Sequence, residues 1–390
     1  NQLRGRGDNR KKIHSFISDR VAIQSKVLFE YTLAMCELHT ARLWTMEPAM
    51  KSLPLLTTAL MLLASTCCAQ NTINFPTIGH IDRFEDSLDN LISPDAKIEV
   101  LCGGFEWAEG PVWLPEDGNK FGGYILFSDI PRNAVMKWQE GVGASVFMKP
   151  AGYTGVADYG AEPGSNGLAL DAEGRLVSCE HGDRRISLLT KGGGKMTLAD
   201  RWDGKRFNSP NDLAIRRNGD IFFTDPIYGL PKHENDPMRE IDFCGIFRVQ
   251  SDGTVTVQNR ELSRPNGIAF SPDQKTLYVA NSDGADPVWR AFPVNDDGNL
   301  GTPKTYFDSS KDERISKGGG DGLKVDASGN VFATGPGGVL VLSSEGKLLG
   351  RIVTGERIGN VAWGNDGSVL YLTSDMYLCR IPTKTKGAGF

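Results

Sequence analysis

A six-fold internal repeat is the feature that most constrains how this chain can fold. Each copy begins with a short apolar strand, continues through a turn rich in Asp, Gly and Asn, and ends in a second strand of β-branched and aromatic residues. The copies start at Glu109, Asn166, Asn211, Asn266, Asp321 and Gly359. A period of roughly 40 to 50 residues with about four strands per copy is typical of propeller blades. The repeat therefore predicts an all-β protein, a six-bladed β-propeller.

Two other classes of protein are disfavoured by the same sequence. Strands do not alternate with helices, and the Gly clusters at Gly192 and Gly318 lie in hairpin or loop context, so neither is a phosphate loop. The formal net charge of −5 argues against nucleic acid as a partner, because phosphate binding needs a basic face. A small molecule is the expected partner.

The first part of the chain differs in character from the repeats. Residues 1–49 contain basic clusters without a strand-and-turn rhythm, and we predict an upstream segment with no fold of its own. Residues 50–69, from Met50, have the charged start, short apolar middle and small-residue end of a secretory signal peptide. This apolar run is too short for a transmembrane helix that remains in the membrane, so we expect an exported protein, periplasmic or extracellular. A lipid anchor through Cys67 or Cys68 is an alternative. Residues 70–98 form a lead-in, and residues 99–390 form the propeller.

The cysteines of the repeat region do not form a metal-binding pattern. Cys102, Cys179, Cys244 and Cys379 are widely spaced, with no C-x-x-C pair, so zinc ligation by cysteine is not expected. We expect buried thiols that behave as small hydrophobic side chains. One disulfide is allowed in an oxidising compartment, and the sequence does not say which.

The first position of each repeat is a candidate site. Because the innermost strand of each blade lines the central channel, residues in the same repeat position arrive at the same height around the axis. The six positions carry two carboxylates, three amides and one glycine. Asn or Asp before Gly is also ordinary turn chemistry, but Glu109 has no such turn role. A ring of carboxylates and amides is the ligand set that calcium prefers, although magnesium, manganese and zinc stay open.

Several motifs of the repeat region resemble one known family. F-E-W-A-E-G-P-V-W at 105–113, C-E-H-G-D-R-R at 179–185, G-K-R-F-N-S-P-N-D at 204–212, R-P-N-G-I-A-F-S-P-D at 264–273 and G-D-G-L-K-V-D at 320–326 carry the likeness. Together they resemble the senescence-marker-protein/gluconolactonase/luciferin-regenerating family, and most of all its bacterial exported gluconolactonases. The resemblance implies a calcium-dependent hydrolase of sugar lactones in carbohydrate metabolism.

The resemblance also implies roles for individual residues. It implies that Glu109, Asn266 and Asp321 ligate the metal, that Asn211 lies close to both the metal and the substrate, and that Asp321 transfers a proton as general base. An arginine that some animal members place two residues before the Asn211 position is Ser209 in this chain, so the substrate contacts differ.

Four further residues are candidates for contact with substrate. Asn166 is the remaining amide of the ring, and His181, which follows a strand of the second repeat, could act as a base near neutral pH or hold sugar hydroxyls. Asp225 and Tyr228 end a strand where a long loop begins that could cover the channel mouth, although Asp225 could instead cap a turn.

Three functions stay open on the sequence. The first is hydrolysis of a sugar lactone, in which the metal polarises the carbonyl and Asp321 takes the proton of the attacking water. The second is a calcium-dependent phosphotriesterase or arylesterase on the same fold, since fold and metal do not decide the substrate. The third is a propeller that binds calcium for stability and is not an enzyme. The oligomeric state is not predicted.

Overall fold

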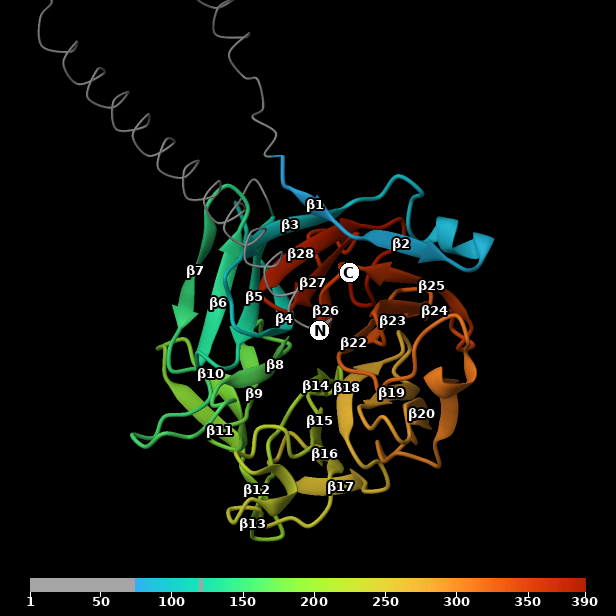
Figure 1. Cartoon of the computed structure of the whole chain (residues 1–390). Helices are drawn as coiled ribbons and strands as arrows, with labels where there is room; N and C mark the ends of the chain where they lie inside the picture. The colour runs from blue at the N-terminus through green and yellow to red at the C-terminus, as the bar shows by residue number, and fades with distance from the viewer. Residues whose placement is uncertain (1–73, 119–121) are drawn as a thin grey trace, which may run out of the picture. The chain divides into compact units, whose positions relative to one another are not determined.

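The computed structural model describes residues 74–118 and 122–390, and these are organised as six antiparallel sheets around a common centre (Figure 1). The predicted signal peptide and upstream segment, residues 1–69, lie outside the described residues. In that part of the chain which is described, no helix is long and apolar enough to span a bilayer. The sheets are numbered below as blades in chain order.

Blades 1 to 3 each contain four strands. Blade 1 consists of β4 (Ala108–Pro115), β5 (Gly123–Asp129), β6 (Ala134–Gln139) and β7 (Gly143–Met148). Blade 2 consists of β8 (Ser165–Leu170), β9 (Leu176–Glu180), β10 (Arg185–Leu189) and β11 (Lys195–Ala199). Blade 3 consists of β14 (Leu213–Ile215), β15 (Ile221–Asp225), β16 (Gly245–Val249) and β17 (Val255–Asn259). A separate hairpin precedes blade 3 and pairs β12 (Arg201–Trp202) with β13 (Lys205–Arg206).

Blades 4 to 6 follow the same plan, and the last two gain strands from the start of the described chain. Blade 4 consists of β18 (Pro265–Phe270), β19 (Thr276–Asn281), β20 (Val288–Pro293) and β21 (Lys304–Asp308). Blade 5 consists of β22 (Leu323–Val325), β23 (Val331–Gly335), β24 (Gly338–Leu342), β25 (Leu348–Val353) and, outermost, β2 (His80–Arg83). Blade 6 consists of β26 (Ile358–Gly364), β27 (Val369–Ser374), β28 (Tyr377–Pro382), β3 (Ile98–Gly103) and β1 (Thr77–Ile78).

Blade 6 closes the ring by joining the two ends of the described chain. Strand β3 pairs with β28, so residues near 100 complete a sheet that residues near 380 began. Three short 3₁₀ helices lie outside the blades: η1 (Asp86–Asn90), η2 (His233–Asn235) and η3 (Ser309–Lys311). The prediction of a six-bladed β-propeller is confirmed, and the two strands predicted for each repeat are the two innermost strands of each blade.

The hydrophobic core lies between neighbouring blades. A separate cluster of buried side chains occupies each of the six blade-to-blade interfaces, which is how stacked sheets bury their apolar faces. Trp289 and Phe307 of blade 4, for example, pack against Leu323 and Leu340 of blade 5. All four described cysteines are free, and Cys179, Cys244 and Cys379 are buried. Burial raises the pKa of the Cys244 thiol to about 12, so it stays protonated.

The innermost strands are tied to one another at the start of each repeat. The amide of Gly167 donates to the carbonyl of Asn211 at 2.7 Å, and the amide of Gly322 donates to the carbonyl of Gly359 at 2.8 Å. The hydroxyl of Thr224 likewise donates to the carbonyl of Asn266 at 2.7 Å. These bonds join blade 2 to blade 3, blade 3 to blade 4 and blade 5 to blade 6, so they fix neighbouring repeat starts to one another.

One residue further along each repeat, a tier of small residues closes the channel. Four of its members are glycines, at 110, 167, 267 and 322, and the other two are Asp212 and Asn360. Asp212 belongs to blade 3 and Asn360 to the opposite blade 6, yet the Asn360 amide donates to Asp212 Oδ2 at 3.2 Å. A side chain at Gly322 would collide with Asn360, since an added Cβ would lie 2.1 Å from its Cγ. The glycines therefore leave room for a polar bridge beneath the ring.

Candidate active site

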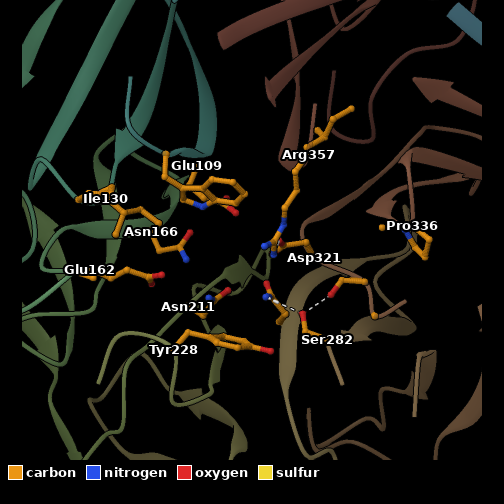
Figure 2. Close-up of a pocket in the computed structure, with 18 of the residues that line it drawn as sticks. Glu109, Ile130, Glu162, Asn166, Asn211, Tyr228, Ser282, Asp321, Pro336 and Arg357 are labelled. Carbon is orange, nitrogen blue, oxygen red and sulfur yellow. Dashed lines mark hydrogen bonds and ion pairs between the residues drawn. The ribbon is translucent and has the colours of Figure 1, made fainter. Parts of the chain in front are cut away.

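The six repeat starts converge on one cavity of about 670 Å³. Its walls include all five of the polar side chains that the sequence placed in the ring: Glu109, Asn166, Asn211, Asn266 and Asp321 (Figure 2). All five are buried, with at most 9% of any residue exposed. The cavity lies within the usual size range for a pocket that takes a small molecule.

Blades 5, 6 and 1 supply the charged part of the ring. Asp321 and Glu109 lie on either side of Gly359, where a Cβ would come within 2.4 Å of Glu109 Oε1. The glycine thus makes space for the glutamate. Burial raises the pKa of Glu109, and the negative charge of Asp321 raises it further. Burial also raises the pKa of Asp321, whereas Arg357 opposes that increase. The pair is costly to ionise together, so the site favours a bound positive charge.

Arg357 lies at the mouth of the cavity and was not anticipated from the sequence. Its Nη2 is 3.1 Å from Asp321 Oδ2, and its guanidinium lies over the Trp107 ring with 4.8 Å to the ring centroid. The side chain is 71% exposed, so most of the guanidinium faces open space. The sequence offered one indication of its location. Arg357 stands two residues before Gly359, and Trp107 stands two residues before Glu109, so the two residues occupy the same position in their repeats.

Blades 2, 3 and 4 supply the amide part of the ring. Asn266 is held by Ser282, because its Nδ2 donates to Ser282 Oγ at 3.0 Å and the Ser282 hydroxyl donates to the carbonyl of Gly320. Since the amide nitrogen is occupied in this way, the Oδ1 of Asn266 is left available as an acceptor or ligand. Tyr228 also lies on this wall, and Ser282 is within hydrogen-bonding reach of its phenol. Ser282 was not singled out from the sequence.

His181 is placed behind the ring, not on the cavity wall. It is fully buried, its Nδ1 lies 3.3 Å from Glu162 Oε2 without hydrogen-bond geometry, and its Nε2 lies 3.4 Å from Asn166 Nδ2. The amide can donate to Nε2 when that nitrogen is unprotonated. His181 therefore contacts the ring through Asn166, and both Asn166 and Glu162 line the cavity, whereas His181 does not.

Asp225 is also away from the cavity wall. It is fully buried and accepts from the backbone amides of Asn208 at 2.7 Å and Ser209 at 2.8 Å. The buried Arg184 donates to the carbonyls of Phe207 and Asn208. Both side chains therefore fix the segment that leads into Asn211. In this structure the contacts of Asp225 are to the backbone, as in the turn-capping alternative.

The loop after Asp225 does reach the cavity through Tyr228. A second, smaller cavity of about 50 Å³ adjoins the first, and its lining residues are Tyr159, Ala161, Glu162, Tyr228, Gly229, Leu230, Pro231 and His233. The structure thus brings the five ring residues and Tyr228 together in one place. It sets His181 and Asp225 behind them as supports.

The residues present fit an oxygen-ligated cation better than a thiolate- or imidazole-ligated one. Within residues 74–118 and 122–390, no three or more His, Cys, Asp or Glu side chains are grouped so as to hold a metal. A metal at the ring must therefore combine the carboxylates of Glu109 and Asp321 with amide oxygens. Mixed carboxylate and amide oxygens suit Ca²⁺ or Mg²⁺, and two carboxylates balance the charge of one divalent ion.

Comparison with known proteins places the repeat region in a known family. The model of the SMP-30/gluconolactonase/LRE-like region matches residues 107–376, which include every ring residue. The chain belongs to this family. A gluconolactonase of Zymomonas mobilis is 36% identical over 333 residues, covering 83% of this chain and 91% of the relative.

Two solved structures share both the fold and the family. A putative gluconolactonase has a TM-score of 0.69 at 30% identity and covers 80% of this chain and 100% of its own. A gluconolactonase of Xanthomonas campestris has a TM-score of 0.67 at 29% identity and covers 80% of this chain and 99% of its own. The family and the six-bladed fold predicted from the sequence motifs are confirmed.

Proposed function

We propose that this chain hydrolyses a sugar lactone in its central cavity, with one divalent metal ion, calcium in the first instance, held by the ring. Hydrolysis of lactones is supported by the family and by the gluconolactonase relatives. The observation that carries the metal and the residue roles is the convergence of two buried carboxylates and three amides on one cavity.

The ring residues divide into ligands and substrate contacts. Glu109, Asp321 and the Oδ1 of Asn266 would hold the ion, with Asn211 beside it. When bound, the ion would polarise the carbonyl of the lactone and stabilise negative charge on its oxygen. Asn166, Asn211 and Tyr228 face the same cavity with hydrogen-bonding groups that suit sugar hydroxyls.

Asp321 is the proposed general base. The oxygen of a water molecule bonds to the carbonyl carbon, and a proton of that water passes to Asp321. The bond from the carbonyl carbon to the ring oxygen then breaks, and the ring oxygen takes that proton back from Asp321 and becomes a hydroxyl. Asp321 lines the cavity beside the proposed ligands, so its carboxylate can accept a proton from a water molecule that attacks there.

The supporting residues act on the positions of these groups. His181 would hold Asn166 from behind, with Glu162 at its other nitrogen, and Asp225 would hold the segment that carries Asn211. In this scheme His181 is a positioning residue and does not itself meet the substrate.

The test is the initial rate of D-glucono-δ-lactone hydrolysis by the full chain. Acid release is measured against the spontaneous background before EDTA treatment, after it, and after Ca²⁺, Mg²⁺, Mn²⁺ or Zn²⁺ is added back. We expect a rate well above background that EDTA abolishes and calcium restores. A rate that EDTA leaves unchanged would exclude the metal. Absence of turnover across a panel of lactones, in folded protein that binds calcium, would favour the phosphotriesterase or binding alternative.

Export of the protein stays a prediction from residues 50–69. Amino-terminal sequencing of protein recovered from the periplasm or medium of an expressing bacterium would test it. A new terminus close to Gln70 is the expected result.

A further inference from the structure

Arg357 belongs to a tier of residues that lies on the mouth side of the ring. The tier consists of the residue two positions before each ring residue, and three of its members, Trp107, Gly319 and Arg357, line the cavity. The six occupants of this tier are Trp107, Gly164, Ser209, Arg264, Gly319 and Arg357. Arg264 is paired with Glu234 of the mouth loop and does not line the cavity, whereas Arg357 does. Arg357 is thus the one cation of this tier that faces the cavity in the described residues.

Two contacts hold Arg357 over the reacting centre. The indole of Trp107, from the neighbouring blade 1, lies against its guanidinium, with 4.8 Å to the ring centroid. Asp321 Oδ2 lies 3.1 Å from Nη2, and Figure 2 shows the two side chains pointing toward each other. An arginine has five N–H donors, and the hydrogen bond to Asp321 uses only one of them. The stacked, planar group therefore keeps most of its donors available beside the cavity that it lines.

The ion pair with Asp321 is not explained by a contribution to folding stability. An ion pair whose arginine is 71% exposed contributes little to folding stability. A divalent ion at the ring would take over the neutralisation of Asp321, and the guanidinium would then be free to bind another anion at the same place. The reaction generates two such anions there: the carbonyl oxygen as charge builds on it, and the carboxylate of the acid product.

We propose that Arg357 is a catalytic residue that binds the carbonyl oxygen of the lactone during hydrolysis and then the carboxylate of the released acid. A planar guanidinium matches a carboxylate with two parallel hydrogen bonds, which lysine cannot reproduce. This inference rests on the proposed lactonase function, and its test is designed so that the two can fail separately.

The test compares Arg357→Gln and Arg357→Lys with a matched control, Arg314→Gln. Arg314 is also paired with an aspartate, Asp312, at 2.6 Å, and its guanidinium also lies over an aromatic ring, that of Phe84, at 5.1 Å. It does not line the cavity. Four quantities are measured for each protein: kcat and KM for D-glucono-δ-lactone, the inhibition constant of D-gluconate, the Kd of D-gluconate by calorimetry, and the Kd of Ca²⁺ by calorimetry.

Arg357→Gln should lower kcat by about a hundredfold, as loss of one oxyanion-binding donor does elsewhere. It should also weaken gluconate binding at least tenfold and leave the calcium Kd unchanged or lower. Arg357→Lys should recover only a minor part of the gluconate affinity, and Arg314→Gln should behave as wild type.

Two results would overturn the assignment. One is gluconate binding and kcat that are both unchanged in Arg357→Gln. The other is loss of calcium binding in that variant, which would make Arg357 a support for Asp321. If wild type hydrolyses no lactone, the proposed function fails, and the calorimetric binding of gluconate to wild type and Arg357→Gln still decides whether Arg357 binds carboxylates.

Discussion

The ring of this propeller is divided into two unlike halves. Blades 5, 6 and 1 place Asp321, Gly359 and Glu109 side by side, with Arg357 above the glycine, whereas blades 2, 3 and 4 place three asparagines. Residues of both halves stand at the same repeat position, in or just before the innermost strand of each blade, and with comparable burial. The repeat therefore sets where a side chain arrives, and the residue type at each blade sets what it does there.

The difference has an electrostatic basis. Buried carboxylates pay a large desolvation cost unless a cation compensates them, so the charged half has a reason to bind metal and a raised pKa. Buried amides are neutral and can both donate and accept, so the amide half can bind sugar hydroxyls at little cost. We infer that the charged half carries the chemistry, with Asn266 as a further ligand of the metal, and that Asn166 and Asn211 of the amide half carry the recognition.

The largest expected effect comes from removing one charge at a time from the charged half. Asp321→Asn should lower kcat by about a thousandfold, the range for loss of a general base, and weaken calcium binding as well. Glu109→Gln should weaken calcium binding and lose activity that excess calcium partly restores. The measurements are steady-state kinetics over a calcium series and calorimetry.

Matched substitutions control for the loss of an acidic group as such. Asp297→Asn and Glu261→Gln make the same changes at exposed positions outside the cavity and should leave both quantities unchanged. If Asp321→Asn keeps the wild-type kcat, Asp321 is not the general base. The two halves of the ring would then not differ in function as inferred above.

A smaller effect is expected in the amide half. Asn211→Ala should raise KM about tenfold, the value of one lost hydrogen bond, while kcat changes by less than about threefold. Steady-state kinetics separate the two parameters. Asn259→Ala, in the outermost strand of the same blade, is the control and should match wild type.

A loss of kcat in place of a rise in KM would contradict the division of roles between the two halves. If Asn211→Ala loses kcat as Asp321→Asn does, with KM unchanged, then Asn211 contributes mainly in the transition state. Asn211 would then belong with the metal ligands, and recognition would rest on Asn166 and Tyr228.

The sequence predicted the parts of the molecule that repeat. Strand, turn and strand recur with a regular spacing, so their hydrophobic pattern predicts six blades. Glu109 and Asp321 are the first residues of their repeats, and this shared position predicts that they occupy equivalent places in their blades. Arg357 and Trp107 escaped this reasoning because their tier has no common residue type. Their contact joins blades 6 and 1, whose proximity depends on the closure of the ring by β3.

The supporting residues show a different limit of the sequence. His181 and Asp225 stand at strand ends, where polar side chains often face a ligand, and the sequence indicates the strand ends correctly. Whether a loop then covers them depends on tertiary packing. The segment around Glu162 and the segment around Gly229 close over His181, so tightly that a Cβ at Gly229 would lie 2.4 Å from its ring.

The smallest predicted effect concerns Ser282, which connects the two halves. Its hydroxyl accepts from Asn266 in the amide half and donates to Gly320, the residue before Asp321 in the charged half. Ser282→Ala should remove the hydrogen bond that orients the Asn266 amide. The amide group could then rotate, and its oxygen would no longer be held toward the proposed ion. Outer partners of metal ligands typically tune affinity, and we expect the calcium Kd to rise by about tenfold, with kcat at saturating calcium nearly unchanged.

Ser310→Ala, which removes an exposed hydroxyl of η3, serves as the control and should leave the calcium Kd as in wild type. A calcium Kd that is also unchanged in Ser282→Ala would mean that the backbone alone fixes the orientation of Asn266. The two halves would then be independent. A tenfold rise would instead show that a neutral hydrogen bond on the amide side sets the affinity of the charged side for its ion, because Ser282 carries no charge of its own.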